Sequence, residues 1–158
     1  MHSDVADKLH FHYMETTGTI SLWYDGRRVA RCKEITQGSR QFFKVGGYFI
    51  KAEYLHENWI GQCGDEIYIH GKIEPKDQQY FTRLLACSDV MDVGIQWTMF
   101  PWYRLSKRKP SLELYDVCSK QVDRLCYKYG IYDVAPYFGI NWFIHNSRPL
   151  IVDCGIRR

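Results

Sequence analysis

The sequence predicts an α+β domain, with antiparallel strands in its first half and helices in its second. Alternating apolar and polar residues joined by glycine turns run from residue 17 to residue 52, which is typical of β-hairpins. Apolar residues recur at helical spacing over residues 112–129. A chain of 158 residues can bury one sizeable core, so we expect residues 1–158 to form a single domain.

The composition is that of a globular protein, since 46% of the residues are hydrophobic and 25% are charged. Aromatic residues make up 16%; their rings can stack on bases or fill a core, and we favour core filling because large rings dominate buried area. The net charge of +3 and the pI of about 8.5 are lower than is typical of nucleic-acid-binding domains. Only residues 104–109 are locally basic, and we interpret them as a solvated loop. A nucleic-acid partner is therefore not expected.

The six cysteines lack the close pairing of a structural zinc site. No apolar run approaches the roughly 18 residues that span a bilayer, and no secretion signal begins the chain. We therefore expect a cytoplasmic protein with reduced thiols and no membrane segment. His10 and His12 would share one face of a strand, but without a third nearby ligand they do not predict a metal site. His56 and Cys63 lie close in sequence, yet no motif identifies Cys63 as a nucleophile.

Two hairpins are expected in the first half, after a short helix over residues 4–13. In the first hairpin, over residues 17–32, Asp25-Gly26 supplies the turn. In the second, residues 41–45 and 48–52 are joined by Gly46-Gly47.

Lys51 lies in the second strand of the second hairpin, and Gly38-Ser39 lies at that hairpin's entrance. A glycine there lets backbone N–H groups face phosphate oxygens. Lys51 is flanked by apolar residues, so its ammonium group either faces solvent or reaches inward to a phosphate and a carboxylate.

The rest of the chain is expected to contain three helices and one buried strand. The helices cover residues 53–62, residues 75–86 with Pro75 near the start, and residues 112–129. The strand covers residues 95–100 and ends at Pro101. The composition changes at about residues 100–110, where we place a hinge between two lobes.

The last quarter of the chain carries Asp133, Asn141 and Asp153. A carboxylate that accepts a proton, together with an amide and a carboxylate that hold a hard cation through oxygen, is the polar set that phosphoryl transfer requires.

In this order the elements resemble the protein kinase-like fold, and in particular the very small kinase-like proteins of bacteriophages and bacteria. The resemblance covers residues 17–158, and its best-matched pieces are residues 38–51, residues 129–133 and Asp153-Cys154-Gly155. It implies a minimal two-lobed fold, with an antiparallel β-rich N-lobe at about residues 17–100 and a reduced helical C-lobe at about residues 101–158.

The resemblance also implies how an ATP molecule would be bound. Lys51 would contact its α and β phosphates, and Glu66 would pair with Lys51, with Glu57 as the rival acid. Gly38 and Ser39 would approach the phosphates as well. The segment from Met99 to Tyr103, including Phe100, would be the hinge that binds adenine.

For catalysis, the resemblance implies that Asp133 is the base and that Asn141 and Asp153 bind Mg²⁺. Two departures from the family pattern reduce the expected chemistry. Asn141 is eight residues after Asp133, where the family has five. Only three residues follow Gly155, so no activation segment or later substrate-binding helices are expected.

Two functions remain open from the sequence. The first is an Mg-ATP-dependent serine/threonine-type kinase that phosphorylates a partner protein. The second is an inactive pseudokinase-like module that inhibits or scaffolds such a partner. By the resemblance, the chain would be encoded by a bacteriophage and its partner would be a protein of the bacterial host cytoplasm.

Overall fold

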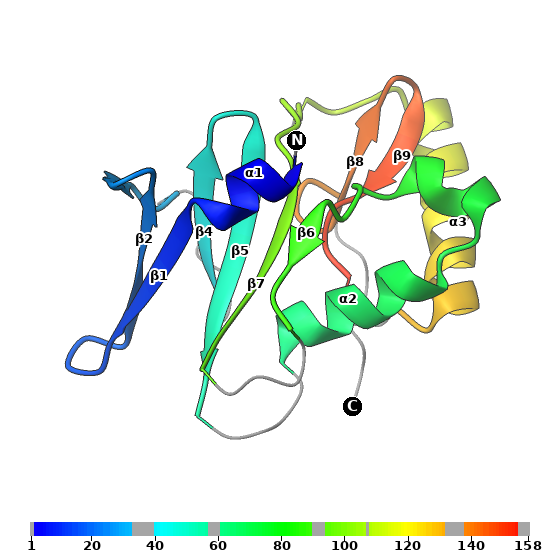
Figure 1. The fold of residues 1–158 in the computed structure, drawn as a ribbon. Helices are drawn as coiled ribbons and strands as arrows, with labels where there is room; N and C mark the ends of the chain where they lie inside the picture. Colours follow the sequence, from blue (N-terminus) through cyan, green and yellow to red (C-terminus); the bar gives the residue numbers. More distant parts are fainter. Residues whose placement is uncertain are drawn as a thin grey trace. The chain divides into compact units, whose positions relative to one another are not determined.

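Antiparallel sheets and a few helices make up an α+β fold, as the sequence predicts (Figure 1). The computed structural model describes residues 2–32, 40–56, 61–89, 94–106, 108–131 and 138–154. The chain divides into two compact units. Unit 1 comprises Met1–Ile67 and Leu84–Trp102, and unit 2 comprises Tyr68–Arg83 and Tyr103–Arg158.

Unit 1 contains two antiparallel sheets, with strand orders β1-β2-β3 and β4-β5-β7-β6 (Figure 1). A short helix, α1 (His2–Asp7), precedes β1 and contacts β6. The strands are β1 (Leu9–Met14), β2 (Thr19–Tyr24), β3 (Arg27–Val29), β4 (Gln41–Val45), β5 (Tyr48–Leu55), β6 (Ala86–Cys87) and β7 (Gly94–Pro101).

The predicted hairpin over residues 17–32 is confirmed as β2 and β3. Asp25 and Gly26 connect the two strands with φ angles of 50° and 76°, the left-handed values that a tight two-residue turn needs. The predicted helix over residues 4–13 is wrong beyond Asp7, because the chain enters β1 at Leu9. Burial alternates along β1, and His10 and His12 lie on its exposed face.

The second predicted hairpin is confirmed as β4 and β5. β5 continues to Leu55, so the helix predicted over residues 53–62 is wrong at its start, and helix α2 begins at Gln62. The buried strand predicted over residues 95–100 is confirmed as β7, which pairs with β5 along its whole length.

The β4-β5-β7-β6 sheet has two different faces. Phe43, Ile50 and Met99 are aligned across the three longer strands and belong to the apolar core that also contains β2 side chains. Phe42, Lys51 and Thr98, each one residue away from that set on its own strand, are aligned in the same way. Because side chains alternate along a strand, these three lie on the opposite face. That second face carries the polar residues examined below.

The segment after β5 forms α2 (Gln62–Lys72) and then a short 3₁₀ helix, η1 (Pro75–Tyr80). The predicted helix over residues 75–86 is therefore too long. Its apolar residues divide between two cores: Phe81 is buried in the core of unit 2, while Leu85 packs against the core of unit 1. One helical face cannot serve both cores, so the chain becomes extended after Tyr80.

Unit 2 is built around α3 (Leu112–Tyr129), whose bounds match the sequence prediction. The Ser111 side chain accepts a hydrogen bond from the Leu114 N–H at the start of α3, and Gly130 ends it with a φ of 66°. The predicted apolar stripe is only partly buried, because Leu112 and Val117 are 81% and 66% exposed. The residues of α3 that reach the core are Cys118, Val122, Leu125, Cys126 and Tyr129.

Between Asn141 and Asp153 the chain forms a hairpin of β8 (Trp142–His145) and β9 (Arg148–Ile151). Its turn residues Asn146 and Ser147 have φ angles of 52° and 59°. Trp142 and Ile151 face each other in the register and are buried against α3 side chains.

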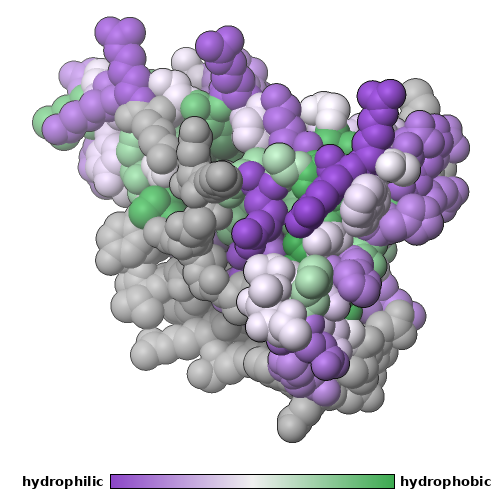
Figure 2. Space-filling model, turned by 90° about the vertical axis from the view of Figure 1, so that its left-hand side faces the viewer, coloured by the Kyte–Doolittle hydropathy of each residue, from purple (hydrophilic) through white to green (hydrophobic). Residues whose placement is uncertain are grey.

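The surface of the described residues is largely polar where it can be seen. Figure 2 views the molecule from the side drawn at the left of Figure 1, and hydrophilic residues cover most of the described surface on that face. None of the described helices has the length and apolarity needed to cross a membrane.

Candidate functional site

A buried ion pair joins β5 to α2. Lys51 Nζ lies 2.9 Å from Glu66 Oε1, and the two side chains are 4% and 1% exposed. The structure thus brings together the lysine and the first-choice acid of the sequence prediction, whereas the rival Glu57 lies outside the described residues. The sequence left open whether Lys51 faces solvent or reaches inward. In the structure it reaches inward.

Arg40 is a second cation on the same carboxylate. Its Nη1 also contacts Glu66 Oε1, and its guanidinium group lies 5.9 Å from the centre of the Phe42 ring. The sequence pattern did not predict a role for Arg40. Nothing in the local pattern shows that the arginine turns inward, because its partner is 26 positions further along the chain.

The surroundings of Lys51 combine aromatic and polar groups. The Lys51 ammonium lies 4.8 Å from the centre of the Phe100 ring, and Thr98 lies directly across from Lys51 on β7. A ring face attracts a nearby cation. Phe100 thus lies beside Lys51, on the same face of the sheet.

Met99 lies on the other face of the sheet from Lys51. Its side chain is fully buried in the core on the other face of the sheet, and its carbonyl accepts a hydrogen bond from the Leu85 N–H at 2.8 Å. Neighbouring residues of a strand point to opposite faces, so Met99 and Phe100 cannot both face Lys51. The contact of Met99 and Phe100 with adenine stays a prediction from the sequence.

Glu53 anchors the beginning of α2. It lies two residues after Lys51, and its Oε1 accepts a hydrogen bond of 2.7 Å from the Cys63 N–H, in the first turn of the helix. The helix starts from Gly61, whose carbonyl accepts from the Asp65 N–H and which has no side chain to cap the helix. A Cβ on Gly61 would lie 2.3 Å from Glu53 Oε1, so the glycine leaves room for this carboxylate. Glu53 lies two positions after Lys51 and therefore on the same face of the strand. This spacing was the sequence signal that could have identified Glu53.

Cys63 is packed inside this cluster as an inert thiol. Its Sγ donates to the Lys51 carbonyl at 3.6 Å, and burial raises the pKa of the thiol to about 12. A nucleophilic cysteine requires the opposite shift. His56, by contrast, is exposed. These observations disfavour the cysteine-hydrolase interpretation.

Asn141 and Asp153 meet at the base of the β8-β9 hairpin in unit 2. Asn141 Nδ2 donates to Asp153 Oδ2 at 3.5 Å, and the Asn141 carbonyl accepts from the N–H groups of Val152 and Asp153. Asn141 is buried and Asp153 is partly exposed. The hairpin therefore brings together two oxygen-bearing side chains that are twelve positions apart in sequence.

These two side chains fit a magnesium site by their chemistry. Mg²⁺ is usually held by one or two protein oxygen ligands together with substrate phosphates and water, not by a complete protein cage. Within the described part of the chain there is no cluster of three or more His, Cys, Asp or Glu side chains that could hold a metal ion. A magnesium ion that is held by one amide and one carboxylate, with phosphate oxygens completing its coordination shell, does not require such a cluster.

Three predicted site residues, Gly38, Ser39 and Asp133, lie outside the described residues. Their proposed contacts with phosphate and substrate remain sequence predictions. The basic segment at residues 104–109 is exposed at Arg104, Arg108 and Lys109, consistent with the solvated loop that we expected.

A second polar cluster, which the sequence did not indicate, lies in unit 2. Asp77 of η1 is buried and accepts hydrogen bonds from Lys128 Nζ at 2.7 Å and from the Tyr129 hydroxyl at 2.5 Å. The hydrogen bond from Lys128 is the main reason why the pKa of Asp77 lies below its ordinary value, and the hydrogen bond from Tyr129 is the second. The Tyr129 hydroxyl also accepts from the Glu74 N–H at 3.0 Å. The cluster fastens η1 to the end of α3, which is a structural role.

Comparison with known proteins identified no relative: no model of a known protein family matches the chain, and no curated protein matches it significantly. The proposed function therefore depends on the chemistry of the Lys51–Glu66 pair and of the Asn141–Asp153 pair.

Proposed function

We propose that this protein binds a magnesium nucleotide, ATP in the first instance, as a minimal kinase-like protein. By the kinase resemblance, Lys51 would contact the phosphates, and Asn141 and Asp153 would bind the metal. The single observation that carries the proposal is the buried Lys51–Glu66 ion pair between a central strand and a helix.

Burial of this pair argues for a functional role. Removing two charges from water is costly, and a buried ion pair is often no more stabilising than apolar residues of the same size. Apolar side chains at positions 51 and 66 would therefore serve the fold alone about as well. A lysine that is held in place by a carboxylate and backed by the Phe100 ring is suited to meet a phosphate oxygen.

The pair Asn141 and Asp153 supports the metal half of the proposal. When Mg-ATP is bound, the metal supplies positive charge that neutralises phosphate oxygens. Asp153 is partly exposed, so an oxygen atom of this carboxylate can reach a ligand, and the hydrogen bond from Asn141 orients it.

Phosphoryl transfer to a protein is the further step of the proposal. Asp133 would accept the proton of a serine or threonine hydroxyl, as the kinase resemblance implies. Incubation with γ-labelled ATP and candidate proteins tests this step, and we expect label transfer that both Asp133→Asn and Asp153→Asn abolish.

A calorimetric titration with Mg-ATP tests nucleotide binding itself. We expect saturable binding by the wild-type protein and at least a tenfold loss of affinity in Lys51→Met. The matched control is Lys44→Met, which removes an exposed lysine from the neighbouring strand and should bind like the wild type. Equal affinity in all three proteins would contradict the assignment of Lys51.

One observation favours the alternative, a pseudokinase-like module that binds a partner protein. α3 exposes large apolar side chains, with Leu112 at 81%, Val117 at 66% and Tyr127 at 82% exposure. Failure of Mg-ATP to bind or to raise the unfolding temperature would favour this alternative, because any ligand of the folded state stabilises it.

A further inference from the structure

A pocket of about 340 Å³ lies in unit 1 where the chain passes from the first sheet to the second. β3 pairs only with the second half of β2. After β3 the chain turns away from β2, and Arg31 forms an isolated β-bridge with Phe43 of β4. This departure opens a wedge between the first half of β2 and β4. Residues 19–21, residues 28–31 and Phe43 line the wedge.

The floor of the pocket is firmly built. Ile20 and Phe43 are 3% and 0% exposed and belong to the core of unit 1. The Ile20 N–H donates at 3.0 Å to Gln41 Oε1, which also accepts from Arg31 Nη1 at 3.4 Å. Gln41 thus ties the β2 edge to the Arg31 side chain, so the pocket has a defined wall.

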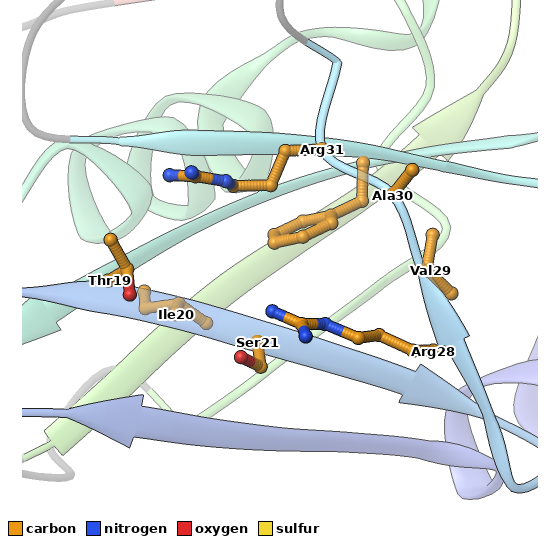
Figure 3. A pocket seen from close by; sticks show the side chains of 8 residues that line it. Thr19, Ile20, Ser21, Arg28, Val29, Ala30 and Arg31 are labelled. Atoms are coloured by element: carbon orange, nitrogen blue, oxygen red, sulfur yellow. The ribbon is translucent and has the colours of Figure 1, made fainter. Parts of the chain in front are cut away.

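The polar groups of the pocket are cationic and hydroxyl groups. The Arg28 and Arg31 side chains extend in the same direction across the pocket, and the hydroxyls of Thr19 and Ser21 lie on the neighbouring strand (Figure 3). No lining residue is acidic, and among the residues that the structure describes neither arginine forms an ion pair. Two guanidinium groups thus line one pocket without an ion-pair partner among the described residues.

This pocket is separate from the proposed nucleotide site. Phe43 points to the core face of its sheet, whereas Phe42 and Lys51 lie on the opposite face. A ligand in the pocket would not contact the Lys51–Glu66 pair.

We propose that the pocket binds a small phosphate monoester. Guanidinium groups bind phosphate through paired N–H donors, and two of them match the charge of a dianion. A phosphate group has enough oxygens to accept from both arginines and from the Ser21 hydroxyl, whereas a carboxylate has only two oxygens. The apolar floor of Ile20, Val29 and Phe43 suits the organic part of the ester, and the volume is within the range of small-molecule sites.

The test is a titration of ¹⁵N-labelled protein with phenyl phosphate, followed by amide chemical shifts. We expect saturable shifts that are largest at residues 19–21 and 28–31, and at least a tenfold weaker affinity in the Arg28→Gln/Arg31→Gln double variant. Benzoate, which carries the same ring on a carboxylate, should bind at least tenfold more weakly than phenyl phosphate.

The matched control is Arg27→Gln. Arg27 is exposed on the same strand but does not line the pocket, so the variant removes one positive charge and should bind phenyl phosphate like the wild type. Equal weakening in Arg27→Gln would show a general charge effect and overturn the proposal. Equal binding of benzoate, shifts centred on Lys51 instead of the pocket, or absence of binding at millimolar phenyl phosphate would overturn it too.

Discussion

Glu66 is the residue on which the buried cluster of unit 1 depends. Its carboxylate oxygen Oε1 contacts both Lys51 and Arg40, and all three side chains are almost completely buried. Loss of Glu66 removes the carboxylate that two buried cations share, whereas loss of Lys51 leaves Glu66 paired with Arg40. The two substitutions should therefore differ in cost.

We expect Glu66→Gln to lower the free energy of unfolding by about 3–5 kcal/mol, because it leaves the buried cations without their shared carboxylate. Lys51→Met should cost about 1–3 kcal/mol, since the remaining ion pair keeps Glu66 compensated. Urea unfolding of both variants measures the difference. A larger loss in Lys51→Met than in Glu66→Gln would show that Arg40 does not stabilise Glu66.

Gly61, the residue before α2, should tolerate a side chain poorly. An alanine Cβ there would collide with the Glu53 carboxylate, so we expect Gly61→Ala to cost about 1–3 kcal/mol of unfolding free energy. Gly71, inside α2, has no atom within 4 Å of an added Cβ, and Gly71→Ala should be neutral or stabilising by up to about 1 kcal/mol. Chemical denaturation compares the two.

A double variant locates the cause of the Gly61 effect. With Glu53→Ala already present, the added Gly61→Ala change should cost much less, because the colliding group is gone. Additive costs would mean that the collision with Glu53 is not the reason.

At the residue scale, the resemblance to the kinase-like fold predicted the Lys51–Glu66 and Asn141–Asp153 pairs. Arg40 and Glu53 were not predicted. Both are buried charges whose partners are decided by packing of β4, β5 and α2, and an exposed charge at these positions would look the same in sequence.

At the scale of elements, the attachment of η1 to α3 depends on Asp77. Its pKa is lowered by the hydrogen bonds from Lys128 and Tyr129, so Asp77 stabilises the folded protein most at pH values above the ordinary Asp pKa. This contribution is lost as the pH falls below about 4 and the carboxylate is protonated.

We expect Asp77→Asn to lower the free energy of unfolding at neutral pH by about 1–3 kcal/mol, because it weakens buried hydrogen bonds to a charged group. The variant should also lose less stability than the wild type between pH 5 and 3, so the two curves converge. Urea unfolding across this pH range provides the test. Asp116→Asn, which removes an exposed i,i+4 ion pair on α3, is the control and should change stability by no more than about 0.5 kcal/mol.

Elements with a strong local signal were predicted well. The hairpin turns have residues suited to left-handed φ angles, and α3 has a capping serine and a terminal glycine, so these bounds follow from local chemistry. The helix predicted over residues 75–86 failed because its apolar residues serve two cores. A period of apolar residues does not reveal which core each residue will join.

At the scale of the whole molecule, the chain divides its polar chemistry between two units. Unit 1 carries the phosphate-binding candidates and unit 2 the metal-binding candidates. Each set belongs to a defined element: Lys51 to β5, Glu66 to α2, and Asn141 and Asp153 to the ends of one hairpin. The central claim is that the protein binds a magnesium nucleotide.

The most direct test is the dependence of ATP affinity on Mg²⁺, measured by calorimetry with and without the metal. If Asp153 holds a metal ion that neutralises phosphate oxygens of the nucleotide, Mg²⁺ should raise the ATP affinity of the wild-type protein at least tenfold. The same addition should leave Asp153→Asn almost unchanged. An equal gain in both proteins, or no effect of Mg²⁺ on the wild type, would contradict the account.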